Sequence, residues 1–223
     1  MVPREGDIKY LVFYLEIGLC GPISFWISLW YNCFVKLDKK IFEIIFHARG
    51  GQGAKTAAEI LAQAALHEQK FVQAFPDFGP ERTGAPIRTY VRISDEPIKT
   101  HEPVVDPDVV VILDETLLGI VDATKNLDEN ESMIVNTTSD RETVKQKTGY
   151  IGNIYPIDAT GLSLEIIGEP RPNTAVLGKL VKVTEIVKLE NVVDVFREKY
   201  TGKIGAEKTE KNVQAIEKAY DSL

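Results

Sequence analysis

The sequence is poor in cysteine and histidine, the residues on which most protein-bound metal centres depend. Among 223 residues there are two cysteines, Cys20 and Cys33, and no C-x-x-C pair occurs. Iron–sulfur clusters are held mainly by several Cys thiolates, so we expect no four-cysteine cluster in this chain. The three histidines, His47, His67 and His101, are too scattered to propose a zinc site. We interpret each as a packing or surface residue.

Positive charge is also scarce. The chain has 26 Lys and Arg against 33 Asp and Glu, which gives a formal net charge of -7. A surface that binds nucleic acid needs clustered Lys and Arg to neutralise phosphates. We therefore expect no nucleic-acid partner. The length suffices for one α/β domain with a sizeable core, but not for two full domains.

The first 39 residues differ in composition from the rest. Between residues 10 and 35 the only formal charge is Glu16, a run long enough to cross a bilayer, which takes about 20 apolar residues. However, a carboxylate near the membrane centre costs roughly 2.5–3.5 kcal/mol, and Gly21-Pro22 interrupts the run. We expect residues 1–39 to be an atypical apolar extension from a mis-assigned start. A weak membrane anchor and a partner-binding extension are the alternatives.

From residue 40 onward, strand and helix patterns alternate. We predict strands at 41–46, 71–75, 87–93, 108–113, 133–135 and 154–157, and helices at 54–69, 174–187, 192–200 and 207–220. Asp114 and Asn173 are the expected caps of helices starting near Glu115 and Thr174. No helix fits between 71–75 and 87–93, so these strands should run antiparallel. The pattern predicts a three-layer α/β/α sandwich with a mixed, mostly parallel sheet in residues 40–223.

A glycine-rich loop follows the first predicted strand. It comprises Gly50, Gly51, Gln52 and Gly53, with Arg49 before it and Lys55 after it. Such a loop lets the backbone approach an anion, and the next helix offers free N–H groups. Neither the P-loop nor the dinucleotide-binding spacing is met. A nucleotide or cofactor phosphate is the expected ligand, and a tight turn without a ligand is the alternative.

A second loop, residues 75–86, contains three prolines and two glycines among its aromatic residues. Long loops of this kind inside a compact domain are usually functional or disordered, and the aromatic and proline content argues against disorder. Its charged pair, Glu81 and Arg82, lies at the centre, next to Gly79 and Pro80. Arg is suited to bidentate contacts with phosphate or carboxylate. A solvated turn between two strands is the alternative.

These segments together resemble the gamma subunit of the pyruvate and 2-oxoisovalerate ferredoxin oxidoreductases, also called pyruvate synthase. The resemblance covers roughly residues 40–220. It rests on residues 47–53 and 75–86, on 106–114 and 134–137, on Asn173-Thr174-Ala175 with Gly178, and on 211–213. One departure is Ala48, where glycine is more usual. The other is the extension before Lys39.

The resemblance implies a cytoplasmic enzyme that oxidatively decarboxylates a 2-oxoacid and passes electrons to ferredoxin. Thiamine diphosphate and [4Fe–4S] clusters would belong to companion alpha, beta and delta subunits, and coenzyme A would accept the acyl group. For this chain it suggests a coenzyme A site built from two groups of residues: Arg49, Gly50, Gly51, Gln52 and Gly53, then Gly79, Pro80, Glu81 and Arg82. We expect no catalytic residue in the chain, because the cofactors carry the chemistry.

Five alternatives stay open from the sequence. One is that the chain is a purely structural scaffold subunit without a ligand site. Both loops could be docking surfaces for the thiamine-binding chains rather than a coenzyme A site. The substrate could be a branched-chain 2-oxoacid instead of pyruvate. The chain could also be a stand-alone nicotinamide-dependent oxidoreductase, or a membrane-anchored redox subunit built on residues 10–35.

Overall fold

The computed structural model describes residues 40–77 and 84–222. Residues 1–39, on which the extension and anchor hypotheses rest, lie outside this range, as do the predicted site residues Gly79, Pro80, Glu81 and Arg82. Within the described residues, no helix has both the length and the apolar character needed to cross a membrane.

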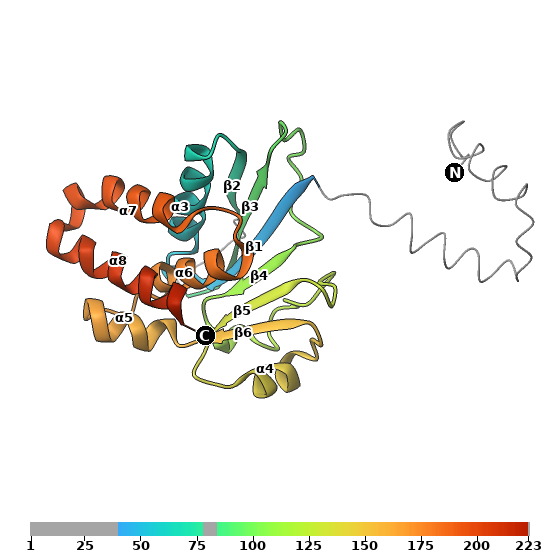
Figure 1. Cartoon of the computed structure of the whole chain (residues 1–223). Coiled ribbons are helices and arrows are strands. Elements are labelled where there is room, and N and C mark those ends of the chain that lie inside the picture. Colours follow the sequence, from blue (N-terminus) through green and yellow to red (C-terminus); the bar gives the residue numbers. More distant parts are fainter. Residues whose placement is uncertain (1–39, 78–83, 223) are drawn as a thin grey trace, which may run out of the picture. The chain divides into compact units, whose positions relative to one another are not determined.

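A six-stranded sheet forms the centre of the domain, in the order β2-β3-β1-β4-β5-β6 (Figure 1). The strands are β1 (Ile41–Arg49), β2 (Phe71–Asp77), β3 (Pro86–Ser94), β4 (Val109–Ile112), β5 (Ser132–Asn136) and β6 (Asn153–Ile157). Strands β1, β4, β5 and β6 pair in parallel, whereas β3 pairs antiparallel with both β1 and β2. The predicted mixed, mostly parallel sheet is confirmed.

Five helices cover one face of the sheet (Figure 1). They are α3 (Ala54–His67), α5 (Ala159–Ile167), α6 (Pro172–Thr184), α7 (Leu189–Ile204) and α8 (Ala206–Asp221). Because side chains alternate along a strand, Ile44 and Phe46 of β1 and Val111 of β4 all point to this face. They pack against helix residues such as Leu61 and Leu177, and all five are fully buried.

The opposite face carries a thinner layer. It consists of the short 3₁₀ helix η1 (Glu115–Leu117), helix α4 (Arg141–Thr148) and irregular connections. Here Ile45 and Val110, the strand neighbours of the residues above, form a second core with Leu117 and Val144. With a core on each face, the domain is an α/β sandwich as predicted.

The structure corrects the prediction at two helix starts. The helix expected near Glu115 is only the single turn η1, although Asp114 does cap it, its side chain accepting a hydrogen bond from the Thr116 N–H. Asn173 is not a cap: α6 begins at Pro172, after Arg171. Proline fits this first position because its fixed φ suits a helix and its missing N–H would have had no partner there.

The sequence pattern also does not predict α4 and α5. In α4 only Val144 is buried, so no apolar stripe marks the helix. In α5 the nine residues include Gly161, which lowers the helix signal. Both helices are instead specified by Asp caps, Asp140 and Asp158.

Candidate functional site

The carboxyl ends of β1, β4, β5 and β6 meet at one edge of the sheet, since these strands are parallel. From β1 the chain continues through α3 to β2 on one side of the sheet, whereas from β4 it continues to β5 and β6 on the other side. The adjacent ends of β1 and β4 therefore form a topological switch point. Open α/β sheets commonly bind ligands at such a point.

The predicted glycine loop lies at the end of β1. Arg49 is the last residue of the strand rather than part of the loop. Its backbone N–H donates to Oε1 of Gln52 at 2.7 Å, and the N–H of Gln52 donates to the carbonyl of Arg49 at 3.1 Å. Gly51 and Gly53 have φ angles of +98° and +83°, which residues with a side chain rarely adopt. The loop is thus a closed turn that requires glycine at two positions.

Helix α3 starts directly after this loop without a side-chain cap. Gly53 precedes the helix, and the first bond within the helix runs from the N–H of Ala57 to the carbonyl of Gly53 at 3.0 Å. The N–H groups of Ala54, Lys55 and Thr56 are the ones that a helix leaves without an internal partner. An anion placed here would meet free donors and the positive end of the helix dipole.

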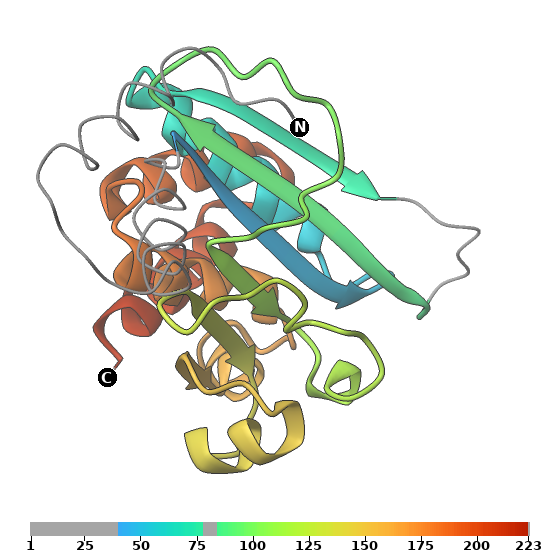
Figure 2. The same ribbon diagram turned by 90° about the vertical axis from the view of Figure 1, so that its right-hand side faces the viewer.

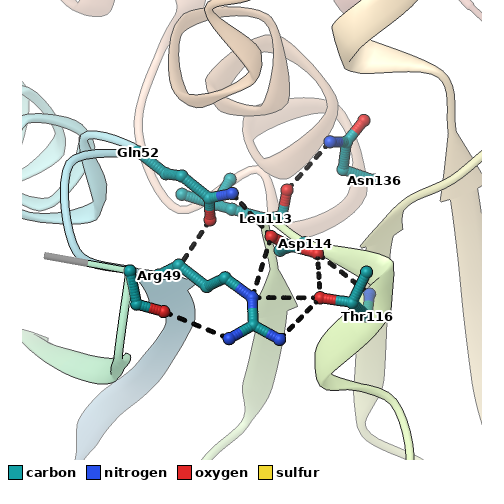
Figure 3. A network of polar contacts seen from close by, with 7 residues as sticks. Arg49, Gln52, Leu113, Asp114, Thr116 and Asn136 are labelled. Atoms are coloured by element: carbon teal, nitrogen blue, oxygen red, sulfur yellow. Dashed lines mark hydrogen bonds and ion pairs between the residues drawn. The ribbon is translucent and has the colours of Figure 1, made fainter.

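Polar side chains from three strand ends form a network beside the loop (Figure 3). The guanidinium of Arg49 lies 3.3 Å from Oδ2 of Asp114, and it donates to Oγ1 of Thr116 from both Nε (3.0 Å) and an Nη atom (2.8 Å). Gln52 donates to Asp114 at 2.7 Å. Arg49 is therefore already neutralised by a carboxylate, and its role is to fix the loop and the end of β4 relative to one another.

The charge state of Asp114 follows from this network. Burial by itself would raise the pKa of Asp114, but hydrogen bonds from Thr116 and Gln52 and the charge of Arg49 outweigh it, so that the pKa is lowered. The carboxylate is thus ionised at neutral pH. The pair Arg49–Asp114 is structural, and we assign it no proton-transfer role.

The second predicted loop leaves the sheet at the end of β2 and rejoins it at β3, beside the end of β1 (Figure 2). At its base, Arg88 of β3 pairs with Asp77 of β2 at 2.9 Å. Where it rejoins the sheet, the carbonyl of Gly84 accepts from an Nη atom of Arg49 at 3.1 Å, and that of Ala85 accepts from the N–H of Gly50 at 2.9 Å. The structure therefore places the returning end of the second loop, at Gly84 and Ala85, against the glycine loop at the carboxyl end of β1.

Asn136, at the end of β5, belongs to the candidate site but is not among the site residues predicted from the sequence. Its amide donates to the carbonyl of Leu113 and to Oγ1 of Thr160, both at 2.8 Å, and accepts from the N–H of Thr160 at 3.1 Å (Figure 3). It joins the end of β4 to the start of α5. Its position directly after a buried strand is the signal that could have identified it.

His47 lies on the same sheet face as Arg49, two residues earlier in β1, and opposite Arg88 in the strand pairing. It is 5% exposed, and its Nδ1 atom has no hydrogen-bond partner among the described residues. Burial, with a smaller effect of the Arg88 charge, lowers the pKa of His47 to about 4. The imidazole is therefore neutral near pH 7, in line with the expected packing role.

Residues 40–77 and 84–222 contain no group of three or more His, Cys, Asp or Glu side chains that could hold a metal ion. Cys20 and Cys33 lie outside this range.

Comparison with known proteins gives consistent results. A family model described as pyruvate ferredoxin/flavodoxin oxidoreductase matches residues 43–222. The chain is 48% identical, over 182 residues, to the pyruvate/ketoisovalerate oxidoreductases common subunit gamma of Thermococcus kodakarensis, which covers 81% of this chain and 96% of that protein. The crystal structure of pyruvate oxidoreductase subunit PORC from Thermotoga maritima is similar with a TM-score of 0.74 and 43% identity, over 82% of this chain and 97% of that chain.

A more distant structure shares the fold. The 2-oxoglutarate:ferredoxin oxidoreductase of Magnetococcus marinus, solved with 2-oxoglutarate, coenzyme A and succinyl-CoA bound, is similar with a TM-score of 0.68 at 20% identity. The match covers 82% of this chain and 31% of that chain. The same domain architecture is thus part of a longer chain in that enzyme.

Proposed function

Since the chain belongs to the pyruvate ferredoxin/flavodoxin oxidoreductase family, we propose that it is the gamma subunit of a pyruvate:ferredoxin oxidoreductase, or pyruvate synthase. The enzyme converts pyruvate, coenzyme A and oxidised ferredoxin to acetyl-CoA, CO₂ and reduced ferredoxin. Thiamine diphosphate and [4Fe–4S] clusters would be held by alpha, beta and delta subunits, in a cytoplasmic complex. A stand-alone nicotinamide-dependent enzyme is not favoured, because the similar proteins named above are oxidoreductase subunits.

Within this complex, the chain would bind part of coenzyme A and help to assemble the subunits. The observation that supports this role is the uncapped start of α3, where Gly53 precedes the helix and the returning end of the second loop, at Gly84 and Ala85, lies alongside. The ADP end of coenzyme A carries several phosphates, which suit free N–H groups and an arginine. The Magnetococcus marinus enzyme, which shares the fold, was solved with coenzyme A bound, and we extend this ligand to the present chain.

In this proposal the residues of the chain bind and orient, and none takes part in bond making. Arg49 and Gln52 would hold the loop in place through Asp114, leaving the backbone N–H groups of α3 for phosphate. Arg82 would supply the positive charge that Arg49, paired with Asp114, no longer offers.

Replacing Arg82 with Ala in the assembled enzyme tests this role. We expect a rise of roughly tenfold in KM for coenzyme A, equivalent to about 1.4 kcal/mol, and little change in KM for pyruvate. Arg197→Ala is the matched control, since Arg197 lies on α7 in surface ion pairs with Glu210 and Asp194. An unchanged KM together with dissociation of the complex would instead identify the second loop as a docking surface.

One observation supports a second substrate, a branched-chain 2-oxoacid. The relative from Thermococcus kodakarensis is named as a gamma subunit common to pyruvate and ketoisovalerate oxidoreductases. The chain could therefore serve a branched-chain 2-oxoacid enzyme as well. A native pull-down of the tagged chain separates the two cases: one set of thiamine-binding partners supports a dedicated pyruvate enzyme, and two sets support a shared subunit.

A further inference from the structure

Helix α6 contains a segment whose role the loop site does not yet explain: Asn173-Thr174-Ala175, followed by Gly178. Gly178 allows α6 and α8 to touch at their backbones, because a Cβ atom on Gly178 would lie 1.9 Å from the carbonyl oxygen of Ile216. Real Cβ atoms essentially never come so close to another heavy atom, so α6 is fixed on α8 with little freedom to shift. The contact with α8 therefore also fixes the position of the start of α6.

That placement puts Asn173 against the glycine loop. A Cβ atom on Gly53 would lie 2.6 Å from Nδ2 and 2.7 Å from Cγ of Asn173. Gly53 also has its φ angle of +83°. Position 53 is therefore restricted twice, by its own backbone conformation and by a side chain from a helix more than one hundred residues away in the sequence.

The carboxamide of Asn173 is partly buried and makes no hydrogen bond within residues 40–77 and 84–222. Other asparagines of the domain behave differently. Asn136 bonds to Leu113 and Thr160, Asn191 donates to Glu68, and Asn212 donates to the carbonyl of Lys208. A partly buried amide normally has a partner, because leaving one unpaired costs free energy. Among the described residues, Asn173 thus adds no hydrogen bond to stability, although it occupies a defined position.

We propose that Asn173 is a positioning residue for the glycine loop: it packs on Gly53 and holds the start of α3 in the conformation that binds the ligand. This inference rests on the proposed coenzyme A site. It assigns to α6 a part in ligand binding, whereas the sequence pattern assigns Asn173 only to capping its own helix. The loop is then held from two sides, by Arg49 and Asp114 on one side and by Asn173 on the other.

The first test is Asn173→Ala in the assembled enzyme. Without the side chain, the loop can move away from its bound conformation, and we expect KM for coenzyme A to rise about three- to tenfold, with kcat and KM for pyruvate unchanged. The thermal unfolding midpoint of the complex should stay the same, since the carboxamide of Asn173 has no hydrogen-bond partner among the described residues. Asn191→Ala is the matched control: it removes the bond to Glu68, so it should lower the midpoint without altering KM.

The second test uses the steric contact itself. Gly53→Ala should raise KM for coenzyme A by more than Asn173→Ala does, because its Cβ atom would clash with Asn173, and adding Asn173→Gly should lower KM toward the value of an Asn173 single variant by removing the clash. Gly168→Ala has the same φ of +83° but nothing within 4 Å of the new Cβ, so it should leave KM unchanged. A double variant no better than Gly53→Ala alone would overturn the role of Asn173.

The outcomes separate this inference from the proposed function. If Arg82→Ala raises KM for coenzyme A and Asn173→Ala does not, the coenzyme A site stands and the role of Asn173 is wrong. If neither variant changes KM, both the coenzyme A site and the positioning role fall. A lower unfolding midpoint of Asn173→Ala with unchanged KM would show an ordinary packing role and would also overturn the inference.

Discussion

Five strands, β1, β2, β4, β5 and β6, end at the carboxyl edge of the sheet, and the junctions that follow β1, β4, β5 and β6 are built in two ways. After β4, β5 and β6, an aspartate accepts a hydrogen bond from the next helical turn: Asp114 from Thr116, Asp140 from Thr143 and Asp158 from Gly161. After β1 the corresponding residue is Gly53, which has no side chain to offer. The β1–α3 junction is the exception.

The difference lies in what each junction leaves for a ligand. An aspartate cap satisfies a free N–H of the helix and places negative charge where an anion would bind. Glycine leaves the donors uncapped, at the expense of local stability, and leaves room for the side chain of Asn173 to pack on it. At each of the three capped junctions, the aspartate satisfies an N–H group of the next helical turn. The β1–α3 junction instead depends on Arg49, Asp114 and Asn173 for its conformation and, in our proposal, on a ligand to satisfy its N–H groups.

The largest effect is expected from moving the helix that packs on the β1–α3 junction. Gly178→Ala would place a Cβ atom against the backbone of α8 and should destabilise the chain by about 3 kcal/mol in chemical denaturation. Gly202→Ala in α7 is the control, since nothing lies within 4 Å of the new atom. This control should stabilise the chain by roughly 0.5–1 kcal/mol, because alanine is the better helix former. Equal effects of the two changes would contradict the tight α6–α8 contact.

The next effect is a pH dependence that comes from β1. The pKa of His47 is lowered to about 4 in the folded chain, against 6.5 for the ordinary group, so the unfolded chain binds more protons between these values. The contribution of neutral His47 to the free energy of unfolding is therefore fully present above pH 6.5 and falls as the pH drops toward 4. We expect a loss of about 2 kcal/mol between pH 7 and pH 5. His47→Asn should remove this part of the pH dependence, whereas replacement of the exposed His101 should not. Denaturation curves at several pH values check this.

Breaking the network beside the β1–α3 junction should have a smaller effect. Asp114→Asn removes the charge that Arg49 contacts and weakens the bonds from Gln52 and Thr116, and we expect a loss of about 1.5 kcal/mol. Since the folded pKa of Asp114 is lowered, its contribution is present above the ordinary value of 3.8 and is lost as the pH falls through the folded pKa. The free energy of unfolding of the variant should thus be lower than that of the wild type at pH 7, and the two values should become equal in acid. A constant difference at all pH values would contradict this account.

The smallest effect is expected at a capped junction. Asp158→Ala removes the acceptor of the Gly161 N–H at 2.7 Å and should destabilise the chain by about 1 kcal/mol. KM for coenzyme A in the assembled enzyme should not change, because α5 already satisfies its own start. A raised KM would show that the capped junctions also take part in binding, and the contrast with Gly53 would be lost.

Much of the fold could be predicted from the sequence. The apolar β1 and β4 segments, the antiparallel pairing of β2 with β3, and the glycine loop before α3 all follow from local patterns. Helix α4 could not be found in this way, because a helix that buries only Val144 has no apolar stripe. In such cases the cap, here Asp140, is a better signal than periodicity.

The candidate site was less predictable than the fold. The residues of the glycine loop could be identified because a cluster of glycines is unusual in a sequence. The residues near that loop, Thr116, Asn136 and Asn173, come from distant segments, and only the packing of the sheet and helices brings them together. Asn173 illustrates the limit. Its local context suggests a cap, yet Pro172 starts the helix and leaves Asn173 to contact Gly53. Contacts of this kind, between residues far apart in the sequence, produce no periodic pattern in a single sequence.

Amide hydrogen exchange of the assembled enzyme, with and without coenzyme A, tests the central claim most directly. If the β1–α3 junction binds the phosphates of coenzyme A, the ligand should slow exchange in the peptide containing Ala54, Lys55 and Thr56, while the capped first turn of α5 stays unchanged. Pyruvate alone should protect neither peptide. Unchanged exchange at the start of α3 under saturating coenzyme A would contradict the account.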